Sequence, residues 1–278
     1  MLNNIYIDDL IKRAIEEDIN YIDVSSDYLI PEDQRNDAYF VAKDDGVLCG
    51  LSIAMRVFEI MDDGFSYDAK KSDGDIVHKG DIIVEFSGNT RAMLKAERTS
   101  LNIIQHMSGI ASITRKAMDL CEGTNATVAD TRKTLPGLRS IQKYAVVCGG
   151  GKNHRYNLSD AAMLKDNHID ASGGIMQAVE ALRSKVGHMT KIEVETRNME
   201  EVAEAVKAGA DVIMLDNMSN EEMKEAVSYI AGRAITEASG NVTLSNIAEV
   251  AKTGVDIISL GMITHSVKAF DISMKMKK

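Results

Sequence analysis

Cysteine is scarce in this chain, which has only Cys49, Cys121 and Cys148 among 278 residues. Their number is odd and they form no C-x-x-C pair. Both observations argue against a disulfide framework and against a cysteine-ligated zinc site. We expect reduced thiols in or near the core and assign them no chemistry.

Long apolar runs are also missing. The first residues, MLNNIYIDDLIKRAIEED, carry acidic side chains early and lack the apolar centre of a secretory signal peptide. No later apolar stretch reaches the length needed to span a bilayer. We therefore expect a cytoplasmic protein without a membrane segment.

Positive charge is in deficit over the whole chain. Lys and Arg number 32 against 42 Asp and Glu, a net charge of −10, which argues against a nucleic-acid binder or an anionic-membrane protein. The segment from Thr131 to Lys165 departs from this balance, with seven basic residues and a single acid, Asp160. This local excess predicts a pocket for a small, multiply charged anion, and the alternative is a basic, solvated surface.

The composition is that of a folded soluble protein, with 45% hydrophobic and 27% charged residues. The first part of the chain combines an amphipathic start with short alternating stretches at Asp37–Ala42 and Gly46–Ile53, which predict antiparallel strands. We expect an N-terminal α+β sandwich of the hammerhead type over residues 1–108. A long helical pattern from Glu97 to about Gly123 connects it to the next domain.

The rest of the chain, residues 109–278, repeats a short apolar run followed by an amphipathic helix. Predicted strands are Ala126–Asp130, Ala161–Leu164, Lys191–Glu195, Asp211–Leu215, Arg233–Glu237 and Asp256–Ser259. Predicted helices are Leu138–Cys148, Gly174–Val186, Glu200–Ala208, Asn220–Ile230 and Leu244–Lys252. This pattern is typical of an α/β protein and predicts an incomplete parallel α/β barrel. We expect a last, C-terminal helix to pack back on the N-terminal domain.

Charged and small residues follow the predicted strands, where a parallel barrel has its active-site mouth. They are Thr131-Arg132-Lys133, Lys165, Glu195, Asp216, Ser239-Gly240 and Gly261. Arginine and lysine suit carboxylates and phosphates, and isolated carboxylates suit Mg²⁺ or sugar hydroxyls. Glycine and serine at such ends offer backbone amides to a phosphate. Together these groups predict a site for a phosphorylated sugar beside an anionic organic molecule.

The motifs at these positions closely resemble those of the quinolinate phosphoribosyltransferase family over almost the whole chain. The matching segments are Glu97–Asn102 (ERTSLN), Thr131–Arg139 (TRKTLPGLR), Lys152–Arg155 (KNHR), Leu164–His168 (LKDNH), Glu193–Glu195 (EVE), Leu215–Asn217 (LDN), Glu237–Gly240 (EASG) and Gly261. The resemblance implies a pentosyltransferase of NAD biosynthesis that joins quinolinate to phosphoribosyl pyrophosphate with Mg²⁺. Its products are nicotinate mononucleotide, diphosphate and carbon dioxide. It also implies a homodimer or hexamer.

The resemblance also implies roles for individual residues. Arg132, His154, Arg155 and Lys165 surround quinolinate, and Arg98 reaches in from a neighbouring subunit. Lys133 lies near the diphosphate, Glu195 and Asp216 near ribose hydroxyls and Mg²⁺, and Ser239, Gly240 and Gly261 near the 5′-phosphate. Thr131, His168 and Asn241 complete the candidate binding residues. Catalysis is expected from Lys133, Lys165, Glu195 and Asp216.

One residue departs from the family pattern, because Asn241 follows Gly240 where a second glycine is usual. Asn tolerates left-handed backbone better than most residues, so we expect phosphate binding to survive. Three alternatives remain at this stage. They are a sister phosphoribosyltransferase acting on nicotinate or associated with molybdenum transport, a Schiff-base aldolase using Lys165, and a non-catalytic sugar-phosphate sensor.

Overall fold

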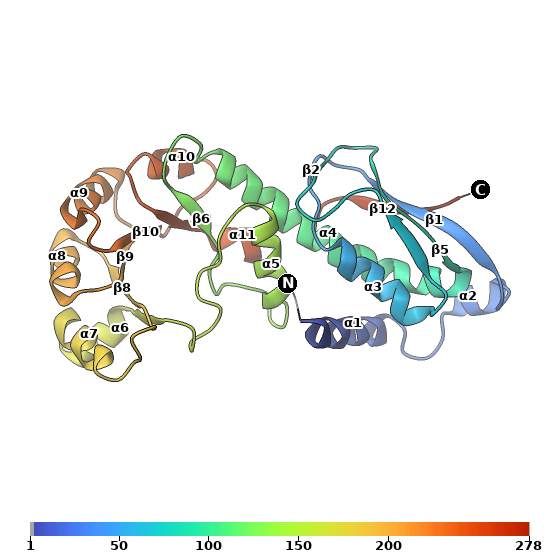
Figure 1. Ribbon diagram of the computed structural model, residues 1–278, viewed down its shortest axis with the longest axis horizontal. Coiled ribbons are helices and arrows are strands. Elements are labelled where there is room, and N and C mark those ends of the chain that lie inside the picture. Colours follow the sequence, from blue (N-terminus) through green and yellow to red (C-terminus); the bar gives the residue numbers. More distant parts are fainter. Residues whose placement is uncertain (1–2, 278) are drawn as a thin grey trace. The chain divides into compact units, whose positions relative to one another are not determined.

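The computed structural model describes residues 3–277. They form two compact units. Figure 1 traces the chain through both units by colour. The first unit takes in the residues up to Arg115, Leu135–Gly150 and the residues from Ser266 onward, and the second takes in Lys116–Thr134 and Gly151–His265. Both units are therefore discontinuous in sequence, whereas the predicted ranges 1–108 and 109–278 are continuous.

The first unit is built on an antiparallel sheet with strand order β12-β1-β5-β3. Its strands are β1 (Arg35–Ala42), β3 (Ser66–Ala69), β5 (Ile82–Asn89) and β12 (Ile272–Met276), and a second small sheet pairs β2 (Gly46–Val47) with β4 (Ile76–Val77). The helices are α1 (Asn4–Asp18), α2 (Val24–Leu29), α3 (Leu51–Met61), α5 (Arg139–Cys148) and most of α4 (Thr90–Asp119). The predicted α+β sandwich is confirmed.

Aromatic rings from strands and a helix form the core of this unit. Phe86 on β5 lies 5.2 Å from Phe40 on β1 and 5.0 Å from Phe58 on α3, measured between ring centroids. All three side chains are buried. Edge-to-face and tilted ring pairs at these distances add to the free energy gained from burial.

The prediction of a strand over Gly46–Ile53 was wrong beyond Val47. Gly50 takes a left-handed backbone (φ 93°), which ends the extended segment, and α3 begins at Leu51. Asp73 Oδ1 accepts the backbone N–H groups of Gly50 and Leu51 at 2.9 Å each, satisfying donors at the helix start. A short apolar run does not by itself distinguish a buried strand from a buried helix.

The C-terminal helix was also a wrong prediction, because Ile272–Met276 forms the strand β12. Ile272 and Met274 are buried and alternate with less buried neighbours, which is the period of a strand. β12 pairs antiparallel with β1, with Ile272 opposite Ala42 and Met276 opposite Ala38. The last segment thus joins the N-terminal sheet through hydrogen bonds between strands.

The second unit contains all six predicted strands, which are parallel. They are β6 (Thr127–Ala129), β7 (Ala162–Leu164), β8 (Ile192–Thr196), β9 (Val212–Asp216), β10 (Ile235–Ser239) and β11 (Ile257–Ser259). Their order in the sheet is β6-β11-β10-β9-β8-β7. Because β6 and β7 are the two edge strands, the barrel is open, as predicted for this part of the chain.

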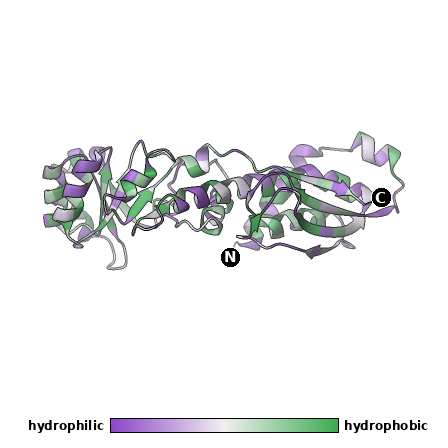
Figure 2. Ribbon diagram, turned by 90° about the horizontal axis from the view of Figure 1, so that it is seen from above, coloured by the Kyte–Doolittle hydropathy of each residue, from purple (hydrophilic) through white to green (hydrophobic). Residues whose placement is uncertain are grey.

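Helices follow the strands of this sheet. They are α6 (Asp166–Ser172), α7 (Ile175–Arg183), α8 (Met199–Ala208), α9 (Asn220–Ile230), α10 (Ile247–Ala251) and α11 (Met262–His265). Of these, α7, α8 and α9 lie along one face of the sheet (Figure 1). In both units the strands are mostly hydrophobic, and the helices carry hydrophilic residues on one side (Figure 2). Among residues 3–277, no helix is both long and apolar enough to cross a membrane.

Candidate active site

A cavity of about 610 Å³ lies at the carboxyl ends of the parallel strands. Its lining residues are Thr131, Arg132, Lys133, His154, Arg155, Met163, Lys165, Glu195, Met214, Asp216, Asn217, Glu237, Ser239, Gly240, Asn241 and Ser259. All of them belong to the second unit. Parallel strands end at one edge of their sheet, so residues far apart in sequence share this mouth.

The structure brings most of the predicted site residues together in this cavity. Those that line it are Thr131, Arg132, Lys133, His154, Arg155, Lys165, Glu195, Asp216, Ser239, Gly240 and Asn241. Arg98, His168 and Gly261 do not line it. The arrangement predicted from strand ends is thus present for the groups that follow β6 to β10.

Two of the three remaining residues support cavity residues from outside. His168 Nδ1 accepts the backbone N–H of Lys165 at 3.1 Å, which fixes the turn into α6. Gly261 faces the Lys133 side chain, because a Cβ placed there would lie 2.9 Å from Lys133 Cδ. Arg98 is exposed on α4, in the first unit.

The cavity also contains residues to which the sequence assigned no role: Met163, Met214, Asn217, Glu237 and Ser259. Met214 and Glu237 stand two residues before Asp216 and Ser239 on β9 and β10, and Met163 on β7 stands two residues before Lys165, which follows that strand. Side chains two apart on a strand point to the same face. This period of two was the signal that could have found the deeper residues from the sequence.

Lys165 and Glu195 form an ion pair at the mouth. The Nζ atom of Lys165, after β7, lies 2.5 Å from Glu195 Oε2 on β8. A Schiff-base lysine must present its Nζ atom to a substrate carbonyl, whereas the Nζ atom of Lys165 contacts a carboxylate. The contact therefore argues against the aldolase alternative.

A side-chain network links Asp216 to the loop after β10. Asn217 donates from Nδ2 to Asp216 Oδ2 at 2.7 Å, and its Oδ1 accepts from Asn241 Nδ2 at 2.9 Å. Asn217 and Asn241 both have left-handed backbones, with φ values of 56° and 50°. Asn241 thus adopts the backbone expected of the glycine that it replaces.

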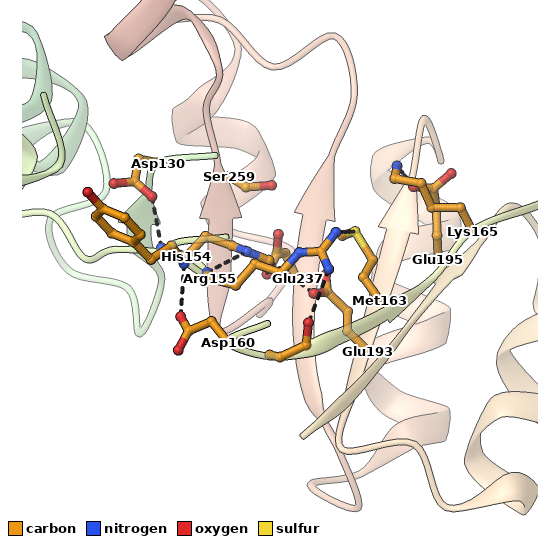
Figure 3. A network of polar contacts seen from close by, with 12 residues as sticks. Asp130, His154, Arg155, Asp160, Met163, Lys165, Glu193, Glu195, Glu237 and Ser259 are labelled. Atoms are coloured by element: carbon orange, nitrogen blue, oxygen red, sulfur yellow. Dashed lines mark hydrogen bonds and ion pairs between the residues drawn. The ribbon is translucent and has the colours of Figure 1, made fainter. Parts of the chain in front are cut away.

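His154 connects three strands below the mouth (Figure 3). Its backbone N–H donates to Asp130 Oδ1, beyond β6, at 2.9 Å. Its Nε2 lies 3.0 Å from Glu193 Oε2 on β8 and 3.5 Å from Glu237 Oε2 on β10. Burial disfavours a charged ring, but the hydrogen bonds and charges of Glu193 and Glu237 outweigh it and raise the pKa of His154 to about 10.

The other ring nitrogen faces the next residue, since Arg155 donates its backbone N–H to His154 Nδ1 at 2.8 Å. A second ring proton would have to displace this contact. The Arg155 N–H therefore disfavours the charged ring that the carboxylates favour. Burial raises the pKa of Glu193; the His154 hydrogen bond works against this rise, and the nearby Glu237 adds to it. The cluster therefore concentrates ionisable groups where water is largely excluded.

Arg155 lines the cavity, and its side chain extends from this cluster toward Met163 (Figure 3). Its guanidinium donates from Nη1 to the Ala161 carbonyl at 3.1 Å and from Nη2 to Met163 Sδ at 3.4 Å. Burial lowers the pKa of Arg155, and the charge of Arg132 lowers it further. Two arginines close enough to repel one another form a strongly cationic region that suits an anion with more than one carboxylate.

The sequence matches two family models that together cover most of the chain. Residues 23–108 match the N-terminal domain of quinolinate phosphoribosyl transferase and residues 110–275 its C-terminal domain. The probable nicotinate-nucleotide pyrophosphorylase [carboxylating] of Bacillus subtilis (strain 168) is 43% identical over 273 residues, covering 98% of this chain and 94% of that protein. The chloroplastic nicotinate-nucleotide pyrophosphorylase [carboxylating] of Arabidopsis thaliana is 45% identical, covering 96% and 82% respectively.

Solved structures agree with the sequence relatives. NadC from Streptococcus pyogenes has a TM-score of 0.96 and 41% identity, covering 99% of this chain and 97% of that one. The nicotinate-nucleotide pyrophosphorylase from Francisella tularensis has a TM-score of 0.96 and 40% identity, covering 100% and 98%. Fold, sequence and the assembled cavity residues lead to one conclusion: this chain belongs to the quinolinate phosphoribosyltransferase family.

Proposed function

We propose that this chain catalyses the reaction for which its relatives are named. It transfers phosphoribosyl from phosphoribosyl pyrophosphate to quinolinate, with loss of carbon dioxide, and forms nicotinate mononucleotide and diphosphate for NAD synthesis. The observation that carries the proposal is the shared cavity, in which Arg132, Lys165, Glu195 and Asp216 meet from four segments of an open barrel. Family membership over the whole chain supports it independently.

Quinolinate, which has two carboxylates on one ring, suits the cationic end of the cavity. Arg132, Arg155 and Lys165 supply fixed positive charge there, and Arg155 is held in place by Ala161 and Met163. A monocarboxylate would leave one of these cations without a partner in a partly dry site. The proposed preference for a dicarboxylate over nicotinate follows from that unpaired charge.

The sugar diphosphate suits the part of the mouth next to this cationic end, where Glu195 contacts Lys165. Lys133 is proposed to contact the diphosphate, while Glu195 and Asp216 are proposed to contact ribose hydroxyls. Ser239, Gly240 and Asn241 form the loop proposed to hold the 5′-phosphate, because its left-handed backbone can turn main-chain N–H groups toward an anion. Gly261 supports this arrangement by leaving room for the Lys133 side chain.

Mg²⁺ fits the donor set at this side. Glu195 on β8 and Asp216 on β9 are carboxylates on neighbouring strands that line the same cavity. Mg²⁺ is commonly held by one or two carboxylates together with substrate phosphates. When bound, the ion would neutralise charge on the diphosphate.

The chain's own residues bind and orient the reactants, and none needs to act as a nucleophile. Breaking the bond between ribose C1 and the diphosphate places positive charge on the sugar and negative charge on the leaving group. Lys133 stabilises the leaving group, while the arginines hold the pyridine nitrogen close to C1. After transfer the ring nitrogen is cationic, which favours departure of the adjacent carboxylate as carbon dioxide; the electron pair left on the ring carbon then takes a proton from water.

The subunit assembly and the cellular location are part of the same proposal. Arg98, exposed on α4, is proposed to complete the quinolinate site of a second copy in a homodimer or hexamer. We also propose that the enzyme works in the cytoplasm.

An assay of the purified chain tests the proposed function. Incubation with quinolinate, phosphoribosyl pyrophosphate and Mg²⁺ should release diphosphate and form nicotinate mononucleotide, both followed by liquid chromatography and mass spectrometry. Nicotinate in place of quinolinate is the matched control and should give little product. Equal turnover of nicotinate would favour the sister enzyme, and binding of both substrates without product would favour the sensor.

A further inference from the structure

Two buried carboxylates lie directly beside the cationic region of the cavity. The side chains of Glu193 and Glu237 are 6% and 1% exposed. The Oε1 atom of each is buried without a hydrogen-bond partner among residues 3–277. Burying two acids beside a site for an anionic substrate opposes both folding and binding. Their placement therefore requires a compensating role.

Both carboxylates converge on one atom. Glu193 comes from β8 and Glu237 from β10, with β9 between them. Their Oε2 atoms lie 3.0 and 3.5 Å from His154 Nε2, at hydrogen-bond distance or just beyond it. Figure 3 shows that these contacts reach His154 from the strands of the barrel. The Nε2 atom is thus turned to the carboxylates.

His154 is held at its backbone as well. Asp130, fully buried after β6, accepts its N–H at 2.9 Å. The residue after β6 and two strands, β8 and β10, therefore fix one residue of an otherwise irregular segment. The residue that follows is Arg155, whose guanidinium lines the cavity.

We propose that Glu193 and Glu237 are positioning residues: they hold the His154 ring through Nε2, and His154 in turn sets the position of Arg155 at the carboxylate-binding end of the cavity. The inference rests on the proposed function for its substrate, quinolinate. It revises the expectation drawn from the family resemblance, because the ring nitrogens of His154 face Glu193, Glu237 and the Arg155 backbone. Arg155 is then the cation of this segment that contacts the substrate.

The first test is kinetic and uses Glu193→Gln, Glu237→Gln and His154→Ala. Loss of the contacts that hold His154 should raise the KM for quinolinate about tenfold or more, since a small misplacement of a binding group such as Arg155 has a large effect. The KM for phosphoribosyl pyrophosphate should stay within about twofold of the unaltered enzyme. Glu225→Gln, an acid exposed on α9, is the matched control and should change neither constant.

A double substitution tests whether the glutamates act through His154. In a His154→Ala background, adding Glu237→Gln should raise the KM for quinolinate by less than about twofold further, because the ring that Glu237 contacts is already absent. Independent, multiplying effects of the two substitutions would overturn the proposal. So would an equal rise in both KM values, which indicates a general structural role.

A ligand-free measurement keeps the inference separable from the proposed function and from misfolding of a variant. Long-range ¹H–¹⁵N spectra of the unaltered protein should show a proton on His154 Nε2 at pH 7, with the signal assigned by His154→Gln. An unprotonated Nε2 would overturn the proposed contacts of the two glutamates with the ring. A stoichiometric metal ion that elemental analysis finds in the unaltered protein but not in Glu237→Gln would overturn them as well. If the protein showed the Nε2 proton but made no nicotinate mononucleotide, only the proposed function would fail.

Discussion

Asn217 occupies the space that a side chain at Gly240 would need. A Cβ atom at Gly240 would come within 2.5 Å of Asn217 Cγ. Gly240 also has a φ of 84°, in the left-handed region. The loop after β10 and the end of β9 therefore fit together only because position 240 lacks a side chain.

Gly240→Ala should disturb the proposed phosphate loop. We expect a loss of ~1–2 kcal/mol in the free energy of unfolding from the left-handed backbone, with a further loss from the overlap with Asn217. The KM for phosphoribosyl pyrophosphate should rise. Gly209→Ala is the matched control, because Gly209 has a φ of 74° and open space at its Cβ position. An unchanged KM in Gly240→Ala would contradict the assigned loop.

Arg132→Ala should weaken quinolinate binding. Removal of the guanidinium leaves one substrate carboxylate without its partner, which costs ~2–5 kcal/mol, or roughly thirty-fold to a few thousand-fold in affinity. Calorimetric titration of quinolinate measures this loss directly. Arg183→Ala, which removes a cation paired with Asp211 outside the cavity, should bind normally. An Arg132→Ala protein with unaltered affinity would refute the assignment.

Glu195→Gln and Asp216→Asn should raise the Mg²⁺ concentration that gives half-maximal rate. Each replaces an anionic oxygen by a neutral amide, and we expect a shift of about tenfold or more. Glu249→Gln, at an exposed ion pair with Lys252, is the control and should leave the Mg²⁺ titration unchanged. Superimposable titrations for all three variants would argue against a metal site at the mouth.

Charge on His154 should depend on Glu193 and Glu237. These carboxylates raise its pKa to about 10, against ~6.5 in an unfolded chain. Their stabilising effect is then fully present below about pH 6.5 and is lost as the pH rises through the folded value. In NMR titrations, Glu237→Gln should lower the midpoint of His154. A midpoint near 6.5 in both proteins would contradict the ion-pair geometry.

Subunit sharing through Arg98 can be tested by complementation. Arg98→Ala and Lys165→Ala chains should each have little activity alone. After subunit exchange, a mixed assembly contains one site with both residues intact, so part of the activity should return. If exchange is verified by mass spectrometry and the activity stays at the level of the separate variants, Arg98 does not act across subunits.

The open barrel and its mouth were predictable because their signals are local. Each strand is a short apolar run followed by an amphipathic helix, and residues such as Lys165 and Asp216 stand directly at strand ends. Parallel topology then brings these ends together without further information. The left-handed backbone at Asn241 is one that this residue type tolerates.

The remaining features depend on contacts between distant segments. Glu193 and Glu237 look like ordinary strand residues until His154 is placed between them. The pairing of β12 with β1 joins segments that are far apart in the sequence, and Ile272–Met276 is too short a stretch to predict a strand when read alone. α5 belongs to the first unit although the segments on both sides of it belong to the second, and the periodicity of a helix does not encode its packing partners.

The most direct test of the central claim follows the carboxyl group that the reaction removes. Quinolinate labelled in the carboxyl group adjacent to the ring nitrogen should yield labelled carbon dioxide in a one-to-one ratio with diphosphate. Release should require both phosphoribosyl pyrophosphate and Mg²⁺, and Arg132→Ala should reduce it. Diphosphate released without carbon dioxide, or no release from a folded protein, would contradict a cavity built to join these two substrates.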